Sequence, residues 1–136
     1  MQTFLPFPDF KLSAQALDNQ RLGKQRIEVL TLLRGKYSNH PAKKMWAGFE
    51  FQLAEYGKAI CLEWLSRTSK KGIPFRDTCL GKISREQARF SNTGLPPWFG
   101  SYAFHEAHKS RLIAKKPEYY RDMFPGTREG LDALWG

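Results

Sequence analysis

The fold of this chain is decided by one stretch near its start, Asp18-Asn19-Gln20-Arg21-Leu22-Gly23-Lys24-Gln25-Arg26-Ile27-Glu28-Val29-Leu30. At about 100° per residue, this stretch predicts a helix with two unlike faces. The apolar face is expected to lie on a core and carries Leu22, Val29, Leu30 and Leu33. The neighbouring polar face carries Arg21, Lys24, Gln25 and Glu28. A solvated surface helix would permit this arrangement, but one carboxylate among cations and an amide also suits chemistry on an anionic polymer.

The composition indicates one domain that acts on a polyanion. The chain has 136 residues, enough for a single domain with a real core, which we expect to span residues 1–136. Lys and Arg outnumber Asp and Glu by 22 to 13, giving a net charge of +9. Such an excess favours nucleic acid as the partner. Aromatic residues mixed with Lys and Arg in the last third of the chain also suit stacking on bases.

The sequence carries no sign of a membrane or of an oxidising compartment. No apolar run approaches the roughly 18 residues of a membrane span, and there is no basic amphipathic anchor or lipidation signal. The N-terminus lacks the charged start and apolar centre of a signal peptide. Cys61 and Cys79 have no metal-like spacing and are interpreted as buried or half-buried free thiols. We expect a cytoplasmic protein.

The first long helix is expected after an extended, proline-punctuated segment over residues 1–12. A cap at Ser13 or Asp18 begins it, and Gly35 stops it. Gly23 within the helix is unfavourable by about 1 kcal/mol relative to alanine. It therefore indicates either a close approach by another segment or a ligand, or a kink.

Two further long helices complete a compact all-α fold with long loops. The second region spans about residues 41–67, with a break near Gly48, and its core-facing stripe consists of Phe49, Leu53, Tyr56, Ile60 and Trp64. Residues 72–99 are predicted to form a long irregular loop. The third helix spans residues 100–116 and is stopped by Pro117, after which a short helical turn is expected. The tail is expected to pack back on the body through Leu131, Leu134 and Trp135.

Three segments, in order, resemble the pyrimidine-dimer DNA glycosylase (endonuclease V) family, and in particular a bacterial branch of compact members. The first is Asn19-Gln20-Arg21-Leu22, followed six residues later by Glu28. The second is Lys71-Gly72-Ile73-Pro74-Phe75-Arg76-Asp77-Thr78. The third is His105-Glu106-Ala107, then Arg111-Leu112 and Lys115-Lys116-Pro117-Glu118-Tyr119-Tyr120. The order and spacing of the three segments, rather than any one of them, carry the resemblance.

The resemblance implies a DNA repair enzyme, a glycosylase with abasic-site lyase activity that needs no metal or other cofactor. Its partner would be double-stranded DNA with damaged or modified pyrimidines, bound with a nucleotide flipped out of the stack. We expect a monomer located in the cytoplasm and associated with the nucleoid. The His105–His108 pair lacks the spacing and the third ligand of a zinc site, so no metal is predicted.

The resemblance also implies the catalytic pair, which is the α-amine of Met1 and the carboxylate of Glu28. The amine would attack C1′ of the damaged nucleotide, and Glu28 would stabilise the cationic sugar and transfer protons. Cations around Glu28 are expected to keep it ionised at neutral pH. Because Gln2 is bulky, Met1 is expected to be retained, in contrast to the small residue that better-known members expose. Lys24 is a fallback nucleophile, although a phosphate contact is the simpler interpretation.

The expected DNA-binding residues are Arg21, Lys24, Gln25, Arg26, His105, Lys109, Arg111, Lys115, Lys116, Tyr119 and Tyr120. Arginines are expected at phosphates, and Gln25 at a base edge or the sugar. Arg26 could equally be a surface arginine whose stem lies on apolar groups. The tyrosines, like Trp98, could instead close the core, and His40 is interpreted as a helix cap.

Two other functions remain compatible with the sequence. One is a nucleic-acid-binding protein without catalytic activity that keeps the fold and the basic face. The other is a glycosylase that acts on an intact hypermodified pyrimidine.

Overall fold

The structure, a computed structural model, describes residues 2–68 and 72–135. These residues form seven α-helices and one 3₁₀ turn and contain no strand, which confirms the predicted all-α fold. The elements are α1 (Phe10–Ala16), α2 (Asn19–Leu33), α3 (Pro41–Met45), α4 (Glu50–Thr68), η1 (Phe75–Asp77), α5 (Cys79–Gln87), α6 (Tyr102–Lys115) and α7 (Pro117–Tyr120). None of the helices in these two ranges combines the length and hydrophobicity of a membrane-spanning segment.

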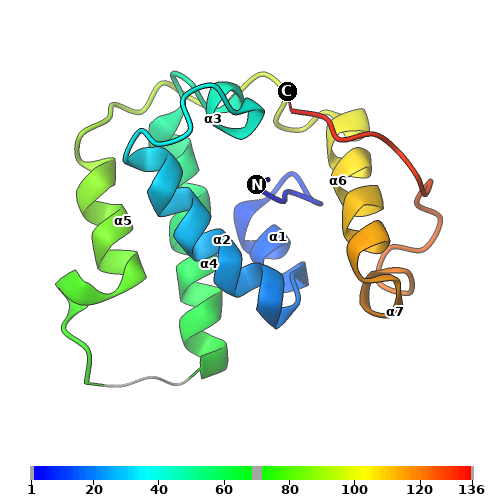
Figure 1. The fold of residues 1–136 in the computed structure, drawn as a ribbon, viewed down its shortest axis with the longest axis horizontal. Helices are drawn as coiled ribbons and strands as arrows, with labels where there is room; N and C mark the ends of the chain where they lie inside the picture. The colour runs from blue at the N-terminus through cyan, green and yellow to red at the C-terminus, as the bar shows by residue number, and fades with distance from the viewer. Residues whose placement is uncertain (1, 69–71, 136) are drawn as a thin grey trace.

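The helices lie on two sides of the N-terminal segment. On one side α2 packs along α4, and α5 flanks both of them (Figure 1). On the other side stand α6 and α7, and the segment before α1 runs between the two groups (Figure 1). This arrangement lets both groups contact an irregular stretch of backbone, and the candidate site depends on those contacts.

The core forms where the predicted apolar stripes meet. Leu22, Val29 and Leu33 of α2 are buried, as are Leu53, Tyr56 and Ile60 of α4. The outer members of the stripes, Leu30, Phe49 and Trp64, are partly buried against them. Trp98 also belongs to the core, because its ring stacks on Phe104 with centroids 4.4 Å apart and its indole N–H donates to the Met45 carbonyl at 3.1 Å.

The ends of α2 follow the expected signals. Asp18 occupies the N-cap position, and the helix ends at Leu33 with Gly35 at a φ of +82° just beyond it. That left-handed conformation favours glycine. The extended segment was predicted too long, because residues 10–16 form the separate helix α1, which is capped by the Asp9 carboxylate at the Leu12 N–H, 2.8 Å away.

Gly23 marks a close approach, one of the two interpretations that the sequence allowed. A Cβ at this position would lie 3.0 Å from Cζ3 of the Trp64 ring on α4. The absence of a side chain therefore lets α2 and α4 pack closely around the Trp64 indole.

The predicted loop over residues 72–99 is wrong in its middle, where α5 forms. The helix begins at Thr78, whose side-chain oxygen accepts from the Gly81 N–H at 3.0 Å. Gly81 is required here, because a Cβ would lie 1.9 Å from the Phe75 carbonyl oxygen. The flanking Pro and Gly residues concealed a nine-residue helix. Lys71, the first residue of the second segment of the family resemblance, lies outside the described residues.

The tail packs back along α6, as expected, and polar side chains of that helix hold it, but Leu134, one of the three residues expected to pack, is 41% exposed. Glu106 accepts from the Arg128 N–H at 3.0 Å, and Ser110 accepts from the Leu131 N–H at 3.0 Å. The tail then passes His108 and brings Trp135 to His40 at the start of α3, with ring centroids 5.6 Å apart. The C-terminal end of the described chain therefore lies near the N-terminal segment (Figure 1).

Candidate active site

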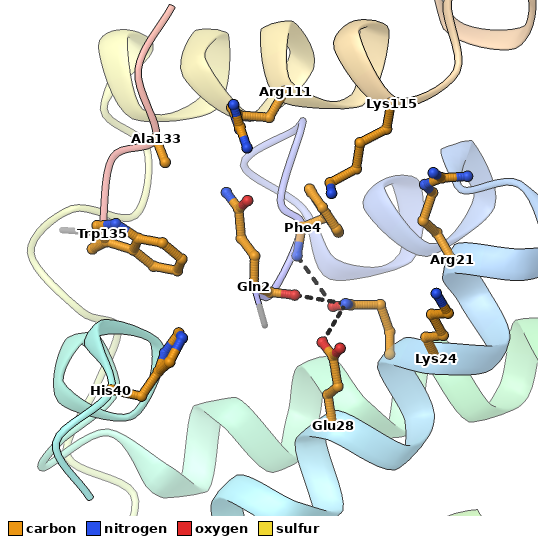
Figure 2. A pocket seen from close by; sticks show the side chains of 11 residues that line it. Gln2, Phe4, Arg21, Lys24, Glu28, His40, Arg111, Lys115, Ala133 and Trp135 are labelled. Atoms are coloured by element: carbon orange, nitrogen blue, oxygen red, sulfur yellow. Dashed lines mark hydrogen bonds between the residues drawn. The ribbon is translucent and has the colours of Figure 1, made fainter. Parts of the chain in front are cut away.

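A cavity of about 410 Å³ opens between the N-terminal segment, α2, α6 and the tail. Its walls are formed by Gln2, Phe4, Arg21, Lys24, Gln25, Glu28, His40, Arg111, Lys115, Ala133 and Trp135. Figure 2 shows these side chains, with Glu28 below Gln2, Arg111 above Gln2, and Arg21, Lys24 and Lys115 on the side opposite His40 and Trp135. The fold thus gathers Glu28, Gln25 and four of the predicted cationic residues around one hollow.

Glu28 is joined to the N-terminal segment through Gln25. The Gln25 side-chain nitrogen donates to a Glu28 carboxylate oxygen at 3.0 Å and to the Gln2 carbonyl oxygen at 2.7 Å (Figure 2). Glu28 and Gln25 lie three residues apart on α2, a spacing that brings side chains together on a helix. One amide group therefore fixes the distance between the carboxylate and the backbone at residue 2.

Gln25 is buried, with 1% of its surface exposed, and both ends of its amide are used. Its two N–H groups serve Glu28 and Gln2, and its oxygen accepts from the Phe4 N–H at 3.1 Å and from the Tyr56 hydroxyl at 2.7 Å. An amide has two donors and two acceptor lone pairs, so its capacity is filled. Gln25 therefore has no group left for the base or sugar contact that the sequence suggested.

Two histidines of α6 hold Leu5 from both sides. The Leu5 N–H donates to Nδ1 of His108 at 2.9 Å, while Nδ1 of His105 lies 2.7 Å from the Leu5 carbonyl oxygen. The second nitrogen of His105 accepts from the Gly100 N–H at 2.9 Å. These partners assign neutral rings with opposite tautomers. Burial lowers the pKa of His105 and lowers the pKa of His108 to about 4, in agreement with neutral rings.

The remaining polar groups of the segment are also paired. The Thr3 hydroxyl accepts from the Trp46 indole N–H at 3.0 Å. The Phe4 carbonyl oxygen lies 2.7 Å from the Tyr56 hydroxyl and shares its single proton with the Gln25 side-chain oxygen. An irregular segment buried this deeply needs such partners, because unpaired backbone groups are unfavourable. Side chains from α2, α4 and α6 and from the residue after α3 therefore fix residues 2–5.

Burial raises the pKa of Glu28 above its ordinary value, although the backbone N–H of Gln2, the Gln25 amide and Lys24 act in the opposite direction. The sequence analysis expected the surrounding cations to dominate. They do not, because the carboxylate is half-buried behind the N-terminal segment. A carboxylate in this environment takes up a proton more readily than one in water, which suits a group that transfers protons.

A buried carboxylate holds the cationic edge of the cavity in place. Asp18, only 2% exposed, lies 3.3 Å from the Arg21 guanidinium and 3.9 Å from the Lys116 ammonium group. Burial alone would raise the Asp18 pKa. The hydrogen bond from Tyr120 and the charge of Arg21 together lower the pKa by more than burial raises it, so the net shift is downward. Asp18 is therefore ionised, orients Arg21 and brings Lys116 to the same edge.

The other predicted DNA-binding residues do not line the cavity. Arg26 stacks over the Trp64 ring at 4.8 Å from its centroid, on another face of α2. Lys109 lies over the Phe7 ring, 5.1 Å from its centroid. Tyr119 is 37% exposed beside Lys116. Arg26 and Lys109 are thus partly buried and Tyr119 is exposed, and none of the three lines the cavity with Glu28.

Two of the predicted contacts lie in the core. His105 is 4% exposed and both of its ring nitrogens have backbone partners. Tyr120 is fully buried, and its hydroxyl donates to the Asp18 carboxylate and accepts from the Asp18 N–H at 2.8 Å. Burial leaves neither ring available to a duplex, so we do not retain His105 and Tyr120 as DNA contacts. His40 caps α3 as expected, because its Nδ1 accepts from the Ala42 N–H at 3.0 Å.

Part of the cavity wall was not predicted from the sequence. Gln2, Phe4, Ala133 and Trp135 were not predicted at the site, and no local pattern links the two ends of the chain. The only signal was the expectation that Trp135 packs back on the body. Met1, the predicted nucleophile, lies outside the described residues.

The chain matches one protein family over its N-terminal part. The model of the pyrimidine dimer DNA glycosylase family matches residues 1–77, more than half of the chain. The chain belongs to this family. Searches of the curated proteins and of the solved structures found no match.

The pyrimidine dimer DNA glycosylase match covers one side of the cavity. It includes the N-terminal segment and α2, and so Gln2, Gln25 and Glu28. It ends before α6, which supplies Arg111 and Lys115. Membership indicates a DNA glycosylase of DNA repair whose substrate is DNA with pyrimidine dimers. The matched residues also include Glu28 and Gln25, the residue that orients it.

Proposed function

We propose that this protein is a DNA glycosylase with abasic-site lyase activity, acting through the α-amine of Met1 with the assistance of Glu28. Its substrates would be pyrimidine dimers or other altered pyrimidines in duplex DNA. The observation that carries the proposal is the Gln2–Gln25–Glu28 hydrogen-bonded unit at the wall of a cationic cavity. In this proposal residues 1–136 form one domain, and the protein binds DNA as a monomer. It works in the cytoplasm, associated with the nucleoid.

Covalent geometry supports the role of the amine. One residue spans at most about 3.6 Å, so the α-amine of Met1 stays within about that distance of the Gln2 nitrogen. The Gln2 N–H in turn faces the Glu28 carboxylate. An α-amine has a pKa of about 7.7–8.0 and is partly unprotonated at neutral pH. It is a better nucleophile there than an ordinary lysine, which places Lys24 second.

The proposed reaction has two stages. In the first, the amine nitrogen forms a bond to C1′, and the bond from C1′ to the base breaks, with the bonding electrons and a proton going to the base. A single altered base then departs, whereas a base in a dimer stays joined to the neighbouring pyrimidine. Opening of the sugar ring gives an imine, and the ring oxygen takes up a proton as it becomes a hydroxyl. In the second, a proton leaves C2′ and the bond to the 3′ phosphate breaks, which cuts the strand. Glu28 stabilises the positive charge on the sugar and imine and transfers these protons.

The cations around the cavity would bind the DNA backbone. Arg21 and Lys24 lie on α2, and Arg111 and Lys115 lie on the facing side of α6 (Figure 2). Phosphate contacts of this kind position a protein on a duplex without reading its sequence. The two helices would therefore contact backbone on both sides of an extruded nucleotide, with Lys116 extending the surface beyond Arg21.

Borohydride trapping tests the proposal. The protein is incubated with ultraviolet-irradiated duplex and with a duplex containing one abasic site, and the mixture is reduced. We expect a covalent protein–DNA adduct and strand cleavage, with the adduct mapped to the N-terminal peptide by mass spectrometry. An adduct mapped to Lys24 would overturn the role of Met1.

Absence of any adduct and of any cleavage would overturn the proposed lyase activity. The protein would then be a DNA-binding member of its family without lyase activity. Acetylation of the N-terminal amine, checked by intact mass, gives an independent control, because it removes the nucleophile while the basic surface remains. We expect the acetylated protein to bind duplex DNA and to give no adduct.

A further inference from the structure

The two cysteines of the chain meet where α2, α4 and α5 pack together, in a part of the fold that the proposed reaction does not use. Both are free thiols, as expected, with Cys61 in α4 and Cys79 at the start of α5. The Cys61 thiol donates a hydrogen bond to the sulfur of Cys79. The Cys79 thiol donates to the backbone carbonyl oxygen of Arg26 in α2, 3.1 Å away. The three helices therefore hold the two sulfur atoms in contact.

The two thiols differ in their access to solvent. Cys61 is 1% exposed, whereas Cys79 is half-buried and lines two cavities, of about 240 Å³ and about 130 Å³. Neither of these cavities shares a lining residue with the cavity beside Glu28. A small molecule that enters them therefore reaches Cys79 more readily than Cys61, and does so apart from the candidate active site.

The surroundings of Cys79 favour its ionised form. Cys79 is the first residue of α5, and the N–H groups at the start of a helix stabilise a negative charge. The hydrogen bond from Cys61 lowers the pKa of the Cys79 thiol. The charges of Arg26 and Lys82 act in the same direction, and burial acts against them. A thiolate is the form of cysteine that reacts with oxidants.

Arg26 supplies a second, independent sign of chemistry at this sulfur. Its guanidinium lies over the Trp64 ring, and its buried Nε has no hydrogen-bond acceptor among the residues that the structure describes. Arg26 lines both of the cavities that Cys79 lines. A buried donor without a partner is unfavourable. An oxygen atom added to the Cys79 sulfur would offer an acceptor in the same cavities.

Cys61 is kept in its protonated form by the same contact. Its hydrogen bond to Cys79, burial and the negative charge of Cys79 all raise the pKa of the Cys61 thiol. Oxidation of Cys79 removes that negative charge and leaves Cys61 facing an electrophilic sulfur. An accessible, ionised thiol beside a second, protected thiol is the arrangement found in redox-sensing cysteines.

We propose that Cys79 and Cys61 are a redox pair, in which a small peroxide oxidises Cys79 and Cys61 then closes a disulfide that ties α4 to α5. In the first step the Cys79 thiolate forms a bond to one peroxide oxygen and the O–O bond breaks. The other oxygen leaves as hydroxide and takes up the proton that the thiol released. In the second step the Cys61 sulfur attacks the sulfur of the sulfenic acid, the S–O bond breaks, and the hydroxyl leaves as water with the Cys61 proton. One peroxide thus becomes two molecules of water, and two thiols become one disulfide.

The disulfide has two consequences for the protein. It protects Cys79 from the irreversible oxidation to sulfinic and sulfonic acids that a sulfenic acid without a neighbouring thiol undergoes. It also closes the chain between Cys61 and Cys79 into a loop, which restricts the unfolded state and stabilises the fold. The link holds the first residue of the nine-residue helix α5 against α4, on which α5 packs (Figure 1).

Peroxide treatment of the wild-type protein tests the redox pair. The reduced full-length protein is treated with an equimolar amount of hydrogen peroxide, the remaining thiols are alkylated, and the proteolytic peptides are mapped by mass spectrometry. We expect the intact protein to lose two hydrogens and to give a peptide in which Cys61 is linked to Cys79, with both changes reversed by dithiothreitol. The midpoint of thermal unfolding should rise by about 5 °C or more in the linked protein.

Cys61→Ser and Cys79→Ser are matched variants, because each keeps one thiol of the pair. When peroxide is added together with dimedone, which labels sulfenic acids, Cys61→Ser should be labelled at Cys79. Cys79→Ser should take up at least about tenfold less label, because the enclosed Cys61 reacts slowly. Peroxide-treated Cys79→Ser also separates the effect of the disulfide on the unfolding midpoint from that of methionine oxidation.

Several results would overturn the redox pair. They are two unreacted thiols in the wild-type protein, oxygen added at Cys79 without a linked peptide, and a disulfide between two copies of the chain. A linked protein whose unfolding midpoint does not rise would also overturn it, because the native packing would then not be suited to the bond. The wild-type measurements require no variant to fold. They are independent of abasic trapping, so the redox pair and the proposed function can fail separately.

Discussion

The Gln25 amide donates to the Glu28 carboxylate across 3.0 Å, one turn along the same helix. The same nitrogen holds the carbonyl oxygen of Gln2 at 2.7 Å. Glu28 is therefore oriented by a residue that itself has no free hydrogen-bonding group. The expected consequences concern both the chemistry of Glu28 and the stability of the fold.

Glu28→Gln should lower strand cleavage of abasic duplex by at least about 100-fold, because it removes the charge that stabilises the cationic sugar and the group that transfers protons. Binding of the same duplex should be largely unchanged, since the cations of the cavity remain. Single-turnover cleavage and fluorescence anisotropy measure the two quantities. Glu55→Gln, at a surface ion pair with Lys58, serves as the control. Equal cleavage by both variants would remove Glu28 from the mechanism.

Gln25→Leu should lower the free energy of unfolding by about 2–4 kcal/mol, because it leaves the Phe4 N–H, the Gln2 carbonyl and the Tyr56 hydroxyl with fewer partners inside the protein. Urea unfolding measures the loss. Gln20→Leu, at an exposed position of the same helix, should change stability by less than about 0.5 kcal/mol. A loss of similar size in both variants would contradict the role given to Gln25.

Acidification should weaken the hydrogen bonds that His105 and His108 make with the Leu5 backbone. The pKa of His108 falls from 6.5 to about 4 on folding, so between these values the unfolded chain binds more protons than the native protein. Stability should therefore rise with pH across this window, by up to about 3 kcal/mol from His108. His105 contributes in the same direction. Urea unfolding between pH 4 and 6.5, the limits that this pKa shift sets, measures the slope.

His108→Asn supplies the matching control for that slope, because asparagine does not titrate in this range. The variant should be less stable than the wild type at neutral pH and should lose less stability on acidification. A slope as steep as that of the wild type would show that other groups cause the acid sensitivity.

Lys115→Gln should weaken DNA binding uniformly across sequences and reduce the salt dependence of the binding constant. The slope of log K against log[salt] should fall by about 1, the effect of losing one phosphate contact. Lys58→Gln, a lysine of α4 that pairs with Glu55, should leave the slope unchanged. Titrations between about 50 and 200 mM salt measure both.

The elements that could be predicted are those whose pattern is local. The stripes of α2 and α4 repeat at three and four residues, so their helices and buried faces followed directly. The helix α5 could not be found this way, because it has nine residues between Pro and Gly segments and depends on Thr78 and the contact of Gly81 with Phe75. Its existence is decided by tertiary packing rather than by propensity.

In the site, too, the residues that could be predicted are those that share a local pattern. Arg21, Lys24 and Glu28 share a helix face, and periodicity alone brought them together. The wall made by Gln2 and Trp135 joins the two ends of the chain, and its geometry depends on hydrogen bonds from α6 to the tail and to Leu5. The prediction of His105 as a DNA contact also failed because its surroundings depend on a distant part of the chain. Its residue type suits DNA, but only the path of the N-terminal segment determines that its ring faces Leu5.

The hydrogen bonds between α6 and Leu5 also determine when the N-terminal segment can be fixed during synthesis. His105 and His108 lie 100 and 103 residues after their partner, so Leu5 leaves the ribosome long before either histidine is made. Before α6 emerges, residues 2–4 can be held by Gln25, Tyr56 and Trp46, but the backbone of Leu5 lacks both of its histidine partners. The complete set of contacts to the N-terminal segment can therefore form only late in translation, and a truncated chain that ends before α6 would carry Glu28 beside a segment that is held from one side.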